Sequence, residues 1–275
     1  MSSTEVESGY APVGGLDMYY EIHGSGPPLV LLHGAYMSID MMAPLLARLA
    51  RDRRVIAPEL RGHARTADAE RPITYERMAD DTAALVGHLG LGEADVAGYS
   101  MGGGVALQVA IRHPAIVRKL VVVSASYATD GMHAAALEML PSVTPEMFAG
   151  SPFEAEYRRL APDPDAFAAL VEKLTQLDAT PFAWPEEAIR AITAPTLLIV
   201  GDSDIVRLEH AVALFGLRGG GVMGDLTGIP RSQLAVIPGT SHFMPPGSGM
   251  LDRADWLVPM ISAFLDAPVT EAEAR

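Results

Sequence analysis

The residue best placed to act as a nucleophile is Ser100, in the run Gly98-Tyr99-Ser100-Met101-Gly102. A short apolar stretch, 94–97, precedes this run, and a helix-like stretch, 103–111, follows it and stops before Pro114. A G-x-S-x-G run between a strand and a helix predicts a sharp turn that exposes the serine hydroxyl at the end of a parallel sheet. Glycine suits both flanks because the turn is strained and its backbone passes too close for a Cβ atom. The run therefore predicts nucleophilic catalysis by Ser100.

A serine hydroxyl is nearly inert at neutral pH and needs a neighbouring imidazole to remove its proton. Of the eight histidines, His242 is the candidate, because it follows a strand-like segment, 234–238, and the turn Gly239-Thr240-Ser241. Ligands bind at the carboxyl ends of the strands in open α/β sheets. We therefore expect His242 to be the general base.

An acidic residue must hold the imidazole in the correct tautomer and stabilise its positive form. The segment 195–201 is typical of a buried strand, and Asp202-Ser203-Asp204 follows at its carboxyl end. Either aspartate could serve. Asp204 is our choice, while Asp202 is expected to organise the turn through its own backbone bonds.

Backbone N–H groups must also stabilise the negative charge that develops on a carbonyl oxygen. The strand-like segment 27–32 ends in His33-Gly34-Ala35-Tyr36, and the turn there can aim an N–H at the reacting group. We assign the N–H groups of Ala35 and Met101 as this pair of donors. His33 is expected to brace the loop rather than to take part in the chemistry. Tyr36 could line the pocket or lend its hydroxyl.

Strand and helix patterns alternate along most of the chain, after an N-terminal hairpin with a Gly14-Gly15 turn. This alternation predicts an α/β fold with a doubly wound, mostly parallel sheet. Thr74 is the expected N-cap of one helix. The expected strands are 10–13, 18–22, 27–32, 53–58, 94–97, 119–123, 196–200 and 234–238, and the expected helices are 39–50, 75–89, 103–111 and 252–264.

Five stretches together resemble the α/β-hydrolase superfamily, in particular its small bacterial esterases, lactonases and cofactor-free haloperoxidases. They are His33-Gly34-Ala35, Glu59-Leu60-Arg61-Gly62-His63, Gly98-Tyr99-Ser100-Met101-Gly102-Gly103, Gly201-Asp202-Ser203-Asp204 and Gly239-Thr240-Ser241-His242. They span nearly the whole chain in the family's order, and the order Ser100, Asp204, His242 is the one associated with this fold.

Two positions depart from the family's usual pattern. Glu59 stands where the family usually has aspartate, and Ala64 where it usually has glycine. Both lie in a loop after the second core strand, in which the family's arginine and histidine are mainly structural, so Arg61 and His63 are expected to be structural too. Epoxide hydrolases and haloalkane dehalogenases of this fold carry aspartate at the position of Ser100, so the resemblance implies acyl transfer to water here.

One region breaks the alternation of strands and helices. Residues 126–192 are rich in methionine and aromatic residues, are interrupted by prolines, and contain no convincing strand. The resemblance implies that this insertion is a helical cap over the active site, with residues 1–125 and 193–275 forming the core domain. Flexible apolar side chains suit the acyl or alcohol portion of an ester. The residues expected to line the substrate pocket are Tyr36, Met132, Met139, Phe148 and Phe243.

Composition excludes several classes of partner. The formal net charge of −14 argues against nucleic acid and anionic membranes, because neutralising phosphates requires clustered lysine and arginine. The chain has no cysteine, a polar and acidic N-terminus without the pattern of a signal peptide, and no apolar stretch of the length that spans a membrane. We therefore expect a cytoplasmic protein without a metal or organic cofactor, and a homodimer is compatible with this composition.

The expected reaction is hydrolysis of a small-molecule carboxylic ester or lactone through an acyl-enzyme on Ser100. Three alternatives stay open. The same triad supports cofactor-free perhydrolase (haloperoxidase) chemistry with hydrogen peroxide as acyl acceptor, and it supports hydrolysis of carbon–carbon bonds in diketone-like substrates. The chain could also be a non-catalytic ligand receptor that retains the triad.

Overall fold

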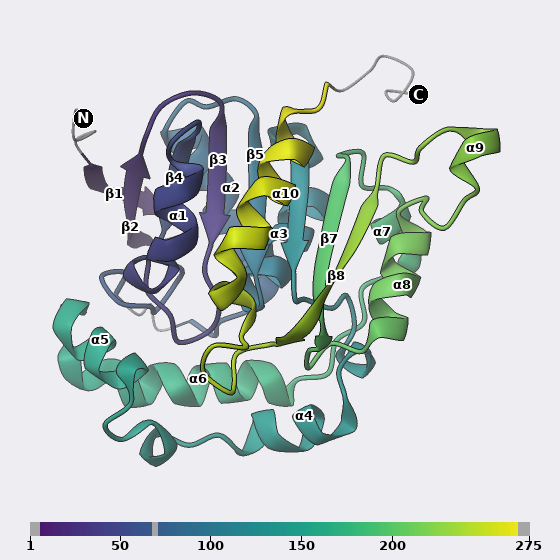
Figure 1. Cartoon of the computed structure of the whole chain (residues 1–275). Coiled ribbons are helices and arrows are strands. Elements are labelled where there is room, and N and C mark those ends of the chain that lie inside the picture. Colours follow the sequence, from purple (N-terminus) through teal and green to yellow (C-terminus); the bar gives the residue numbers. More distant parts are fainter. Residues whose placement is uncertain (1–5, 68–70, 269–275) are drawn as a thin grey trace.

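The computed structural model of the chain describes residues 6–67 and 71–268. It contains one eight-stranded sheet in the order β1-β2-β4-β3-β5-β6-β7-β8 (Figure 1). The strands are β1 (Glu7–Val13), β2 (Leu16–His23), β3 (Pro28–Leu32), β4 (Arg54–Pro58), β5 (Ala94–Tyr99), β6 (Val117–Val123), β7 (Thr196–Ser203) and β8 (Gln233–Ser241). β1 and β2 form an antiparallel hairpin, β2 pairs antiparallel with β4, and the pairs from β4 to β8 are parallel. The predicted α/β fold with a mostly parallel sheet is confirmed.

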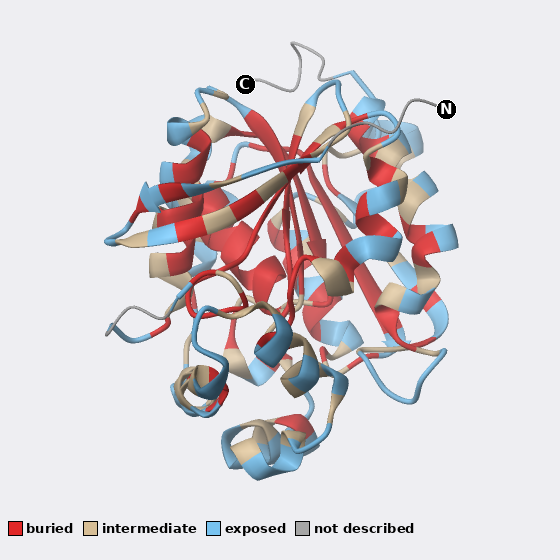
Figure 2. Ribbon diagram, turned by 90° about the vertical axis from the view of Figure 1, so that its left-hand side faces the viewer, coloured by how far each residue is buried: buried red, intermediate tan, exposed pale blue. Residues whose placement is uncertain are grey.

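Helices cover both faces of the sheet. One face is covered by α1 (Ala43–Leu49) and α10 (Ala254–Asp266), whose leucines and phenylalanines pack on the strands in one buried cluster. The other face is covered by α2 (Tyr75–His88), α3 (Met101–Arg112) and α8 (Leu208–Leu217), which share a second buried cluster. Figure 2 shows the result, in which the central strands are buried while the outer sides of the helices are exposed. Two such layers are required because a parallel sheet is apolar on both faces.

Several element boundaries differ from the expected ones by one to three residues, among them the start of β1 and the end of β7. The expected helix 39–50 begins with a 3₁₀ turn, Asp40–Met42, before α1, and the expected helix 252–264 begins with a 3₁₀ turn, Met250–Arg253, before α10. Helix ends commonly tighten in this way. β8 runs three residues beyond the expected end of its strand and stops directly before His242. Thr74 is the N-cap of α2, and its side chain accepts a hydrogen bond of 3.2 Å from the N–H of Arg77.

The segment between β6 and β7 lies across the carboxyl ends of the parallel strands (Figure 1). It contains α4 (Ala134–Met139), α5 (Pro152–Leu160), α6 (Phe167–Ala179) and α7 (Glu186–Arg190). Residues 126–192 are all described, and none of them forms a strand of the sheet. We call this part of the chain the cap segment. A second connection, between α8 and β8, contains the short helix α9 (Gly224–Thr227) and projects from the side of the molecule (Figure 1).

Candidate active site

Ser100 lies in a strained turn between β5 and α3. Its backbone dihedral angles are φ 56° and ψ −122°, a combination that few residues other than glycine adopt. A Cβ atom on Gly98 would lie 2.0 Å from the carbonyl oxygen of Gly102, and one on Gly102 would lie 2.5 Å from the carbonyl oxygens of Leu32 and His33. The glycines on either side of Ser100 are therefore required by close backbone contacts, and the turn holds the serine at the carboxyl end of β5.

The predicted serine, histidine and aspartate form one hydrogen-bonded chain. Ser100 Oγ lies 2.8 Å from His242 Nε2, and His242 Nδ1 lies 2.8 Å from Asp204 Oδ1. Because an ionised carboxylate can only accept, Nδ1 must be the protonated nitrogen of the neutral ring. Nε2 is then the acceptor and can receive the hydroxyl proton of Ser100. Each of the three residues follows the end of a different parallel strand, β5, β7 or β8.

Asp204 is buried and accepts four hydrogen bonds. Besides His242, its donors are the hydroxyl of Ser124 at 2.5 Å and the N–H groups of Val206 at 3.2 Å and Gly201 at 3.4 Å. Burial alone would raise the pKa of this carboxyl, but its hydrogen bonds and the positive charge of protonated His242 hold the pKa below the usual value. The carboxylate is therefore ionised at neutral pH and stabilises a positive imidazole.

Two further residues position the triad, and sequence reasoning missed both. Ser124, the donor to Asp204, directly follows β6 and has a φ of 53°. Tyr99 donates from its hydroxyl to the carbonyl oxygen of His242 at 2.8 Å and stacks on the imidazole ring with centroids 5.3 Å apart. The position of Ser124 at a strand end is the signal that could have indicated it. Nothing in the sequence around Tyr99 indicates its contact with a loop 143 residues away.

Asp202 connects its own turn to the end of the neighbouring strand. Its carboxylate accepts from the N–H groups of Gly239 at 2.9 Å and Thr240 at 3.1 Å, on the neighbouring strand. Within its own turn Asp202 also accepts from the Ser203 hydroxyl at 3.2 Å and from its own backbone N–H, as expected, and the bonds to the neighbouring strand arise because β7 and β8 are adjacent and their ends meet. Asp202 thus fixes the loop that carries His242.

The two predicted oxyanion donors come from the loop after β3, which holds Ala35, and from the first residue of α3, Met101. Ala35 and Met101 both line the cavity in front of Ser100, and within the described part of the chain neither of their N–H groups donates to a protein acceptor. Two buried histidines brace this loop. His63 Nε2 accepts from the N–H of Tyr36 at 3.2 Å, and His33 Nε2 accepts from the N–H of Leu60 at 3.0 Å.

Burial keeps both bracing histidines neutral. Loss of hydration lowers the pKa of His33 to about 3 and that of His63 to about 4. Each ring therefore has one unprotonated nitrogen at neutral pH, which is what accepting from a backbone N–H requires. In the same region, Arg61 forms a buried ion pair of 2.8 Å with Asp81.

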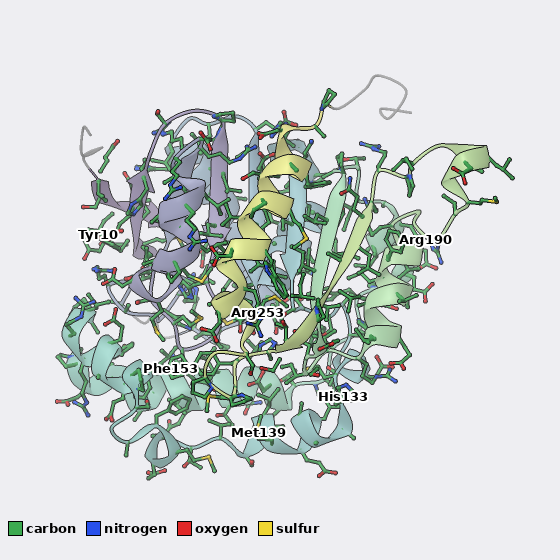
Figure 3. The ribbon with its side chains drawn as sticks, viewed as in Figure 1. Tyr10, His133, Met139, Phe153, Arg190 and Arg253 are labelled. Atoms are coloured by element: carbon green, nitrogen blue, oxygen red, sulfur yellow. The ribbon has the colours of Figure 1, made fainter. Side chains whose placement is uncertain are left out.

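A cavity of about 460 Å³ separates the ends of the strands from the cap segment. All five residues expected to line the pocket border it, namely Tyr36, Met132, Met139, Phe148 and Phe243. Met139 and Phe243 are about half exposed and lie at its rim. Figure 3 labels Met139 and Phe153, which border the cavity from two different parts of the cap segment. Its wall is mostly apolar, and among the described lining residues none is lysine or arginine.

The described residues show neither a metal site nor a membrane-spanning helix. They contain no group of three or more His, Asp or Glu side chains able to hold a metal ion. None of the helices in residues 6–67 and 71–268 combines the length and the apolar character needed to cross a lipid bilayer.

Comparison with known proteins gives one family and several relatives. A family described as "alpha/beta hydrolase fold" matches residues 27–181. A soluble epoxide hydrolase from Corynebacterium sp. (strain C12) is 39% identical over 123 residues, which cover 44% of this chain and 42% of that protein. This chain thus matches less than half the length of that relative. A 2-hydroxymuconate semialdehyde hydrolase from Pseudomonas sp. (strain CF600) is 32% identical over 225 residues, 70% of this chain and 75% of that protein.

Solved structures show the same fold at low sequence identity. The crystal structure of the enol-lactonase from Burkholderia xenovorans LB400 has a TM-score of 0.67 and 21% sequence identity, covering 94% of this chain and 100% of that one. At this identity the likeness concerns the fold, so the chemistry must be argued from the site itself.

Proposed function

We infer that this chain, which belongs to the alpha/beta hydrolase fold family, is a serine hydrolase that cleaves a carboxylic ester or lactone through an acyl-enzyme on Ser100. The observation that carries the proposal is the hydrogen-bonded chain Ser100–His242–Asp204, with both links at 2.8 Å, beside the unpaired N–H groups of Ala35 and Met101. A nucleophile, a base, an orienting acid and two oxyanion donors are the groups that acyl transfer requires.

The proposed mechanism begins when Ser100 Oγ attacks the carbonyl carbon while His242 Nε2 takes the hydroxyl proton. The former carbonyl oxygen becomes an oxyanion that the N–H groups of Ala35 and Met101 stabilise, each contributing about 10²–10³ in rate. His242 then returns the proton to the leaving alkoxide, which departs as an alcohol. Water repeats the sequence on the acyl-enzyme, releasing the acid and restoring Ser100.

The nucleophile in the turn between β5 and α3 is Ser100, so this site does not fit chemistry that needs a carboxylate nucleophile. The match to the Corynebacterium epoxide hydrolase therefore supports membership of the family. It does not support epoxide opening, because epoxide hydrolases of this fold carry aspartate at the position of Ser100. The broad match to the Pseudomonas hydrolase favours one second candidate, hydrolysis of a carbon–carbon bond by the same triad. The absence of lysine and arginine among the described cavity-lining residues disfavours a substrate that carries a carboxylate.

The test combines labelling with a substrate series. A fluorophosphonate probe should label Ser100, and p-nitrophenyl esters from acetate to decanoate should be turned over by the wild type. Ser100→Ala should abolish labelling and lower turnover by about 10⁶, whereas Ser142→Ala, a matched change at an exposed serine of the cap segment, should change neither. Labelling that persists in Ser100→Ala would refute the assignment of the nucleophile. Cleavage of a vinylogous diketone by a wild type that turns over no ester would favour the second candidate.

A further inference from the structure

The cap-side wall of the cavity has one polar corner. Asp178 lies in the last turn of α6 and lines the same cavity as Ser100. Among the described residues that line the cavity, it is the only carboxylate, and no basic side chain of lysine or arginine accompanies it. The neighbouring residues of the wall on α6, Leu174 and Leu177, are apolar. Asp178 is partly buried, and withdrawing a charge from water without giving it a partner is unfavourable.

Asp178 has no hydrogen-bond or ion-pair partner within the described residues. Burial raises the pKa of its carboxyl to about 7. Its place at the carboxyl end of α6 adds to the cost of the negative charge, because the free carbonyl groups there form the negative end of the helix dipole. Within residues 6–67 and 71–268, no hydrogen bond or ion pair therefore stabilises the ionised form of this side chain.

A second unsatisfied group lies in the same corner. The hydroxyl of Tyr36 is buried without a hydrogen bond of good geometry among the described residues, and the neighbouring Thr175 hydroxyl, which acts on the pKa of Tyr36, already donates to the carbonyl oxygen of Val143 at 2.9 Å. The negative charge of Asp178 contributes to raising the pKa of both Tyr36 and Tyr75, which places the three side chains close together. Ring contacts hold both phenols in position, with centroids 4.6 Å apart for Tyr36 and Phe148 and 5.2 Å apart for Tyr75 and Phe182.

We propose that Asp178 and the Tyr36 hydroxyl form a subsite for a hydrogen-bond donor of the substrate, with a protonated amine as the preferred donor. A carboxylate can only accept, so its ligand must donate. A charged donor gains more than a neutral one, and the aromatic faces around the corner favour a cation further. The same corner disfavours a substrate with its own carboxylate, because the described cavity wall offers no cation to pair with it.

The kinetic test rests on the proposed ester hydrolysis. It compares p-nitrophenyl heptanoate, 6-hydroxyhexanoate, 6-aminohexanoate and adipate, and the matching acetates of heptanol, 6-hydroxyhexanol and 6-aminohexanol, so that either side of the ester can reach the corner. In at least one series the amine should exceed the methyl compound at least 10-fold in kcat/KM, and the adipate should fall at least 10-fold below it. Equal rates for the methyl, amine and carboxylate members would overturn the proposal.

Variants of Asp178 make the test specific. Asp178→Leu should abolish the preference for both donors, whereas Asp178→Asn should keep part of the hydroxyl preference and lose the amine preference. Glu172→Gln, which removes a charge from the exposed side of the same helix, should leave all ratios unchanged. If Asp178→Asn and Asp178→Leu alter every substrate by the same factor, Asp178 is structural and the subsite is refuted.

A binding measurement separates this proposal from the proposed function. Calorimetry on Ser100→Ala would use hexylamine, hexanol and hexanoate as probes. Hexylamine should bind at least 10-fold more tightly than hexanoate, and adding Asp178→Leu should remove the difference. If no ester is hydrolysed but hexylamine still binds through Asp178, the proposed function fails while the subsite stands. Equal binding of hexylamine and hexanoate would refute the subsite alone.

Discussion

Each wall of the cavity has an aspartate nearby, and the two carboxyl groups have opposite environments, since Asp204 is buried and Asp178 is partly buried. Asp204, on the core side, accepts four hydrogen bonds, and its pKa is held below the usual value. Asp178, on the cap side, accepts none from the described residues, and burial raises its pKa to about 7. In both, burial acts to raise the pKa, so burial by itself does not decide whether a carboxyl ionises. The partners that the fold brings to each group decide it.

The carboxylate of Asp204 already has its hydrogen-bond partners in the folded protein, whereas that of Asp178 would gain a partner only from a ligand. The partners of Asp204 come from strand ends, which are rigid and meet at one edge of the sheet, so its bonds are made before any substrate arrives. Asp178 lies on a cap helix whose neighbours in the cavity are apolar. The core wall is thus built for chemistry, and the cap wall is built to select what reaches it.

The largest effect is expected from Asp204→Asn. An asparagine amide can donate to His242 Nδ1, which favours the tautomer with its proton on Nε2 and removes the acceptor for Ser100. We expect kcat to fall by about 10⁴, as an equivalent change does in the serine-protease triad, while circular dichroism shows an intact fold. Stopped-flow or steady-state ester hydrolysis would measure this.

Asp202→Asn is the matched control for that variant, because Asp202 lies two residues away and accepts from N–H groups of the neighbouring strand, from its own N–H and from the Ser203 hydroxyl. Its kcat should fall less than 10-fold. Asp178→Asn should likewise leave kcat on p-nitrophenyl acetate within a few-fold. Comparable losses in Asp202→Asn and Asp204→Asn would contradict the assignment of Asp204 as the acid.

A smaller effect is expected from Ser124→Ala, which removes one donor from Asp204 and leaves the other three. Hydrogen bonds to charged groups are worth about 1.5–3 kcal/mol, so kcat/KM should fall about 10-fold. The same variant should lower the midpoint of thermal unfolding by a few degrees. Ser126→Ala, at a serine of the cavity wall two residues further along, serves for comparison. An unchanged kcat/KM in Ser124→Ala would show that the remaining donors suffice.

The smallest effect concerns stability and pH. The carboxyl of Asp178 has a pKa of about 7 in the folded protein, above the ordinary value of about 4, so the folded state binds more protons than the unfolded state between these values. Stability therefore falls as the pH rises from about 4 to 7. A pKa difference of about three corresponds to at most about 4 kcal/mol, and because the side chain is only partly buried we expect Asp178→Asn to recover about 1 kcal/mol of this loss at pH 8.

Urea unfolding at pH 4 and pH 8 tests this expectation. The difference in the free energy of unfolding between Asp178→Asn and the wild type should be near zero at pH 4 and should reach its full size at pH 8. The groups that face Asp178 are Tyr36 and Tyr75, which stay neutral over this range because their pKa values are raised. His242 also lines the cavity, but it is present in both proteins, so its contribution to the pH dependence cancels in the difference between them. A stability difference that does not change with pH would mean that Asp178 is paired in solution.

The order of strands and helices could be predicted well because local patterns carry it. Continuous apolar runs such as 196–200 indicate strands buried on both faces, and a glycine-flanked serine after such a run indicates a sharp turn. Boundaries were less certain: the 3₁₀ turns before α1 and α10 and the extension of β8 to Ser241 depend on how neighbouring elements meet. Prediction of Ser100, Asp204 and His242 as neighbours needed only the rule that parallel strands end at one edge.

The partners of these residues could not be predicted in the same way. Tyr99 and His242 are separated by 143 positions and Ser124 and Asp204 by 80, and no local pattern connects either pair. The position of Asp178 in the cavity is even harder to predict from the sequence, since a charged residue near the end of an amphipathic helix ordinarily faces water. It lines the cavity only because the cap segment packs over the strand ends.

The sequence alone thus determined the fold class and which strand ends hold the reactive groups, because backbone periodicity and turn chemistry are local properties of the chain. Only the tertiary structure decided which carboxyl is satisfied and which is not. Hydration, hydrogen-bond partners and charge at a buried group depend on segments far apart in the sequence, and these meet only when the cap segment closes over the sheet.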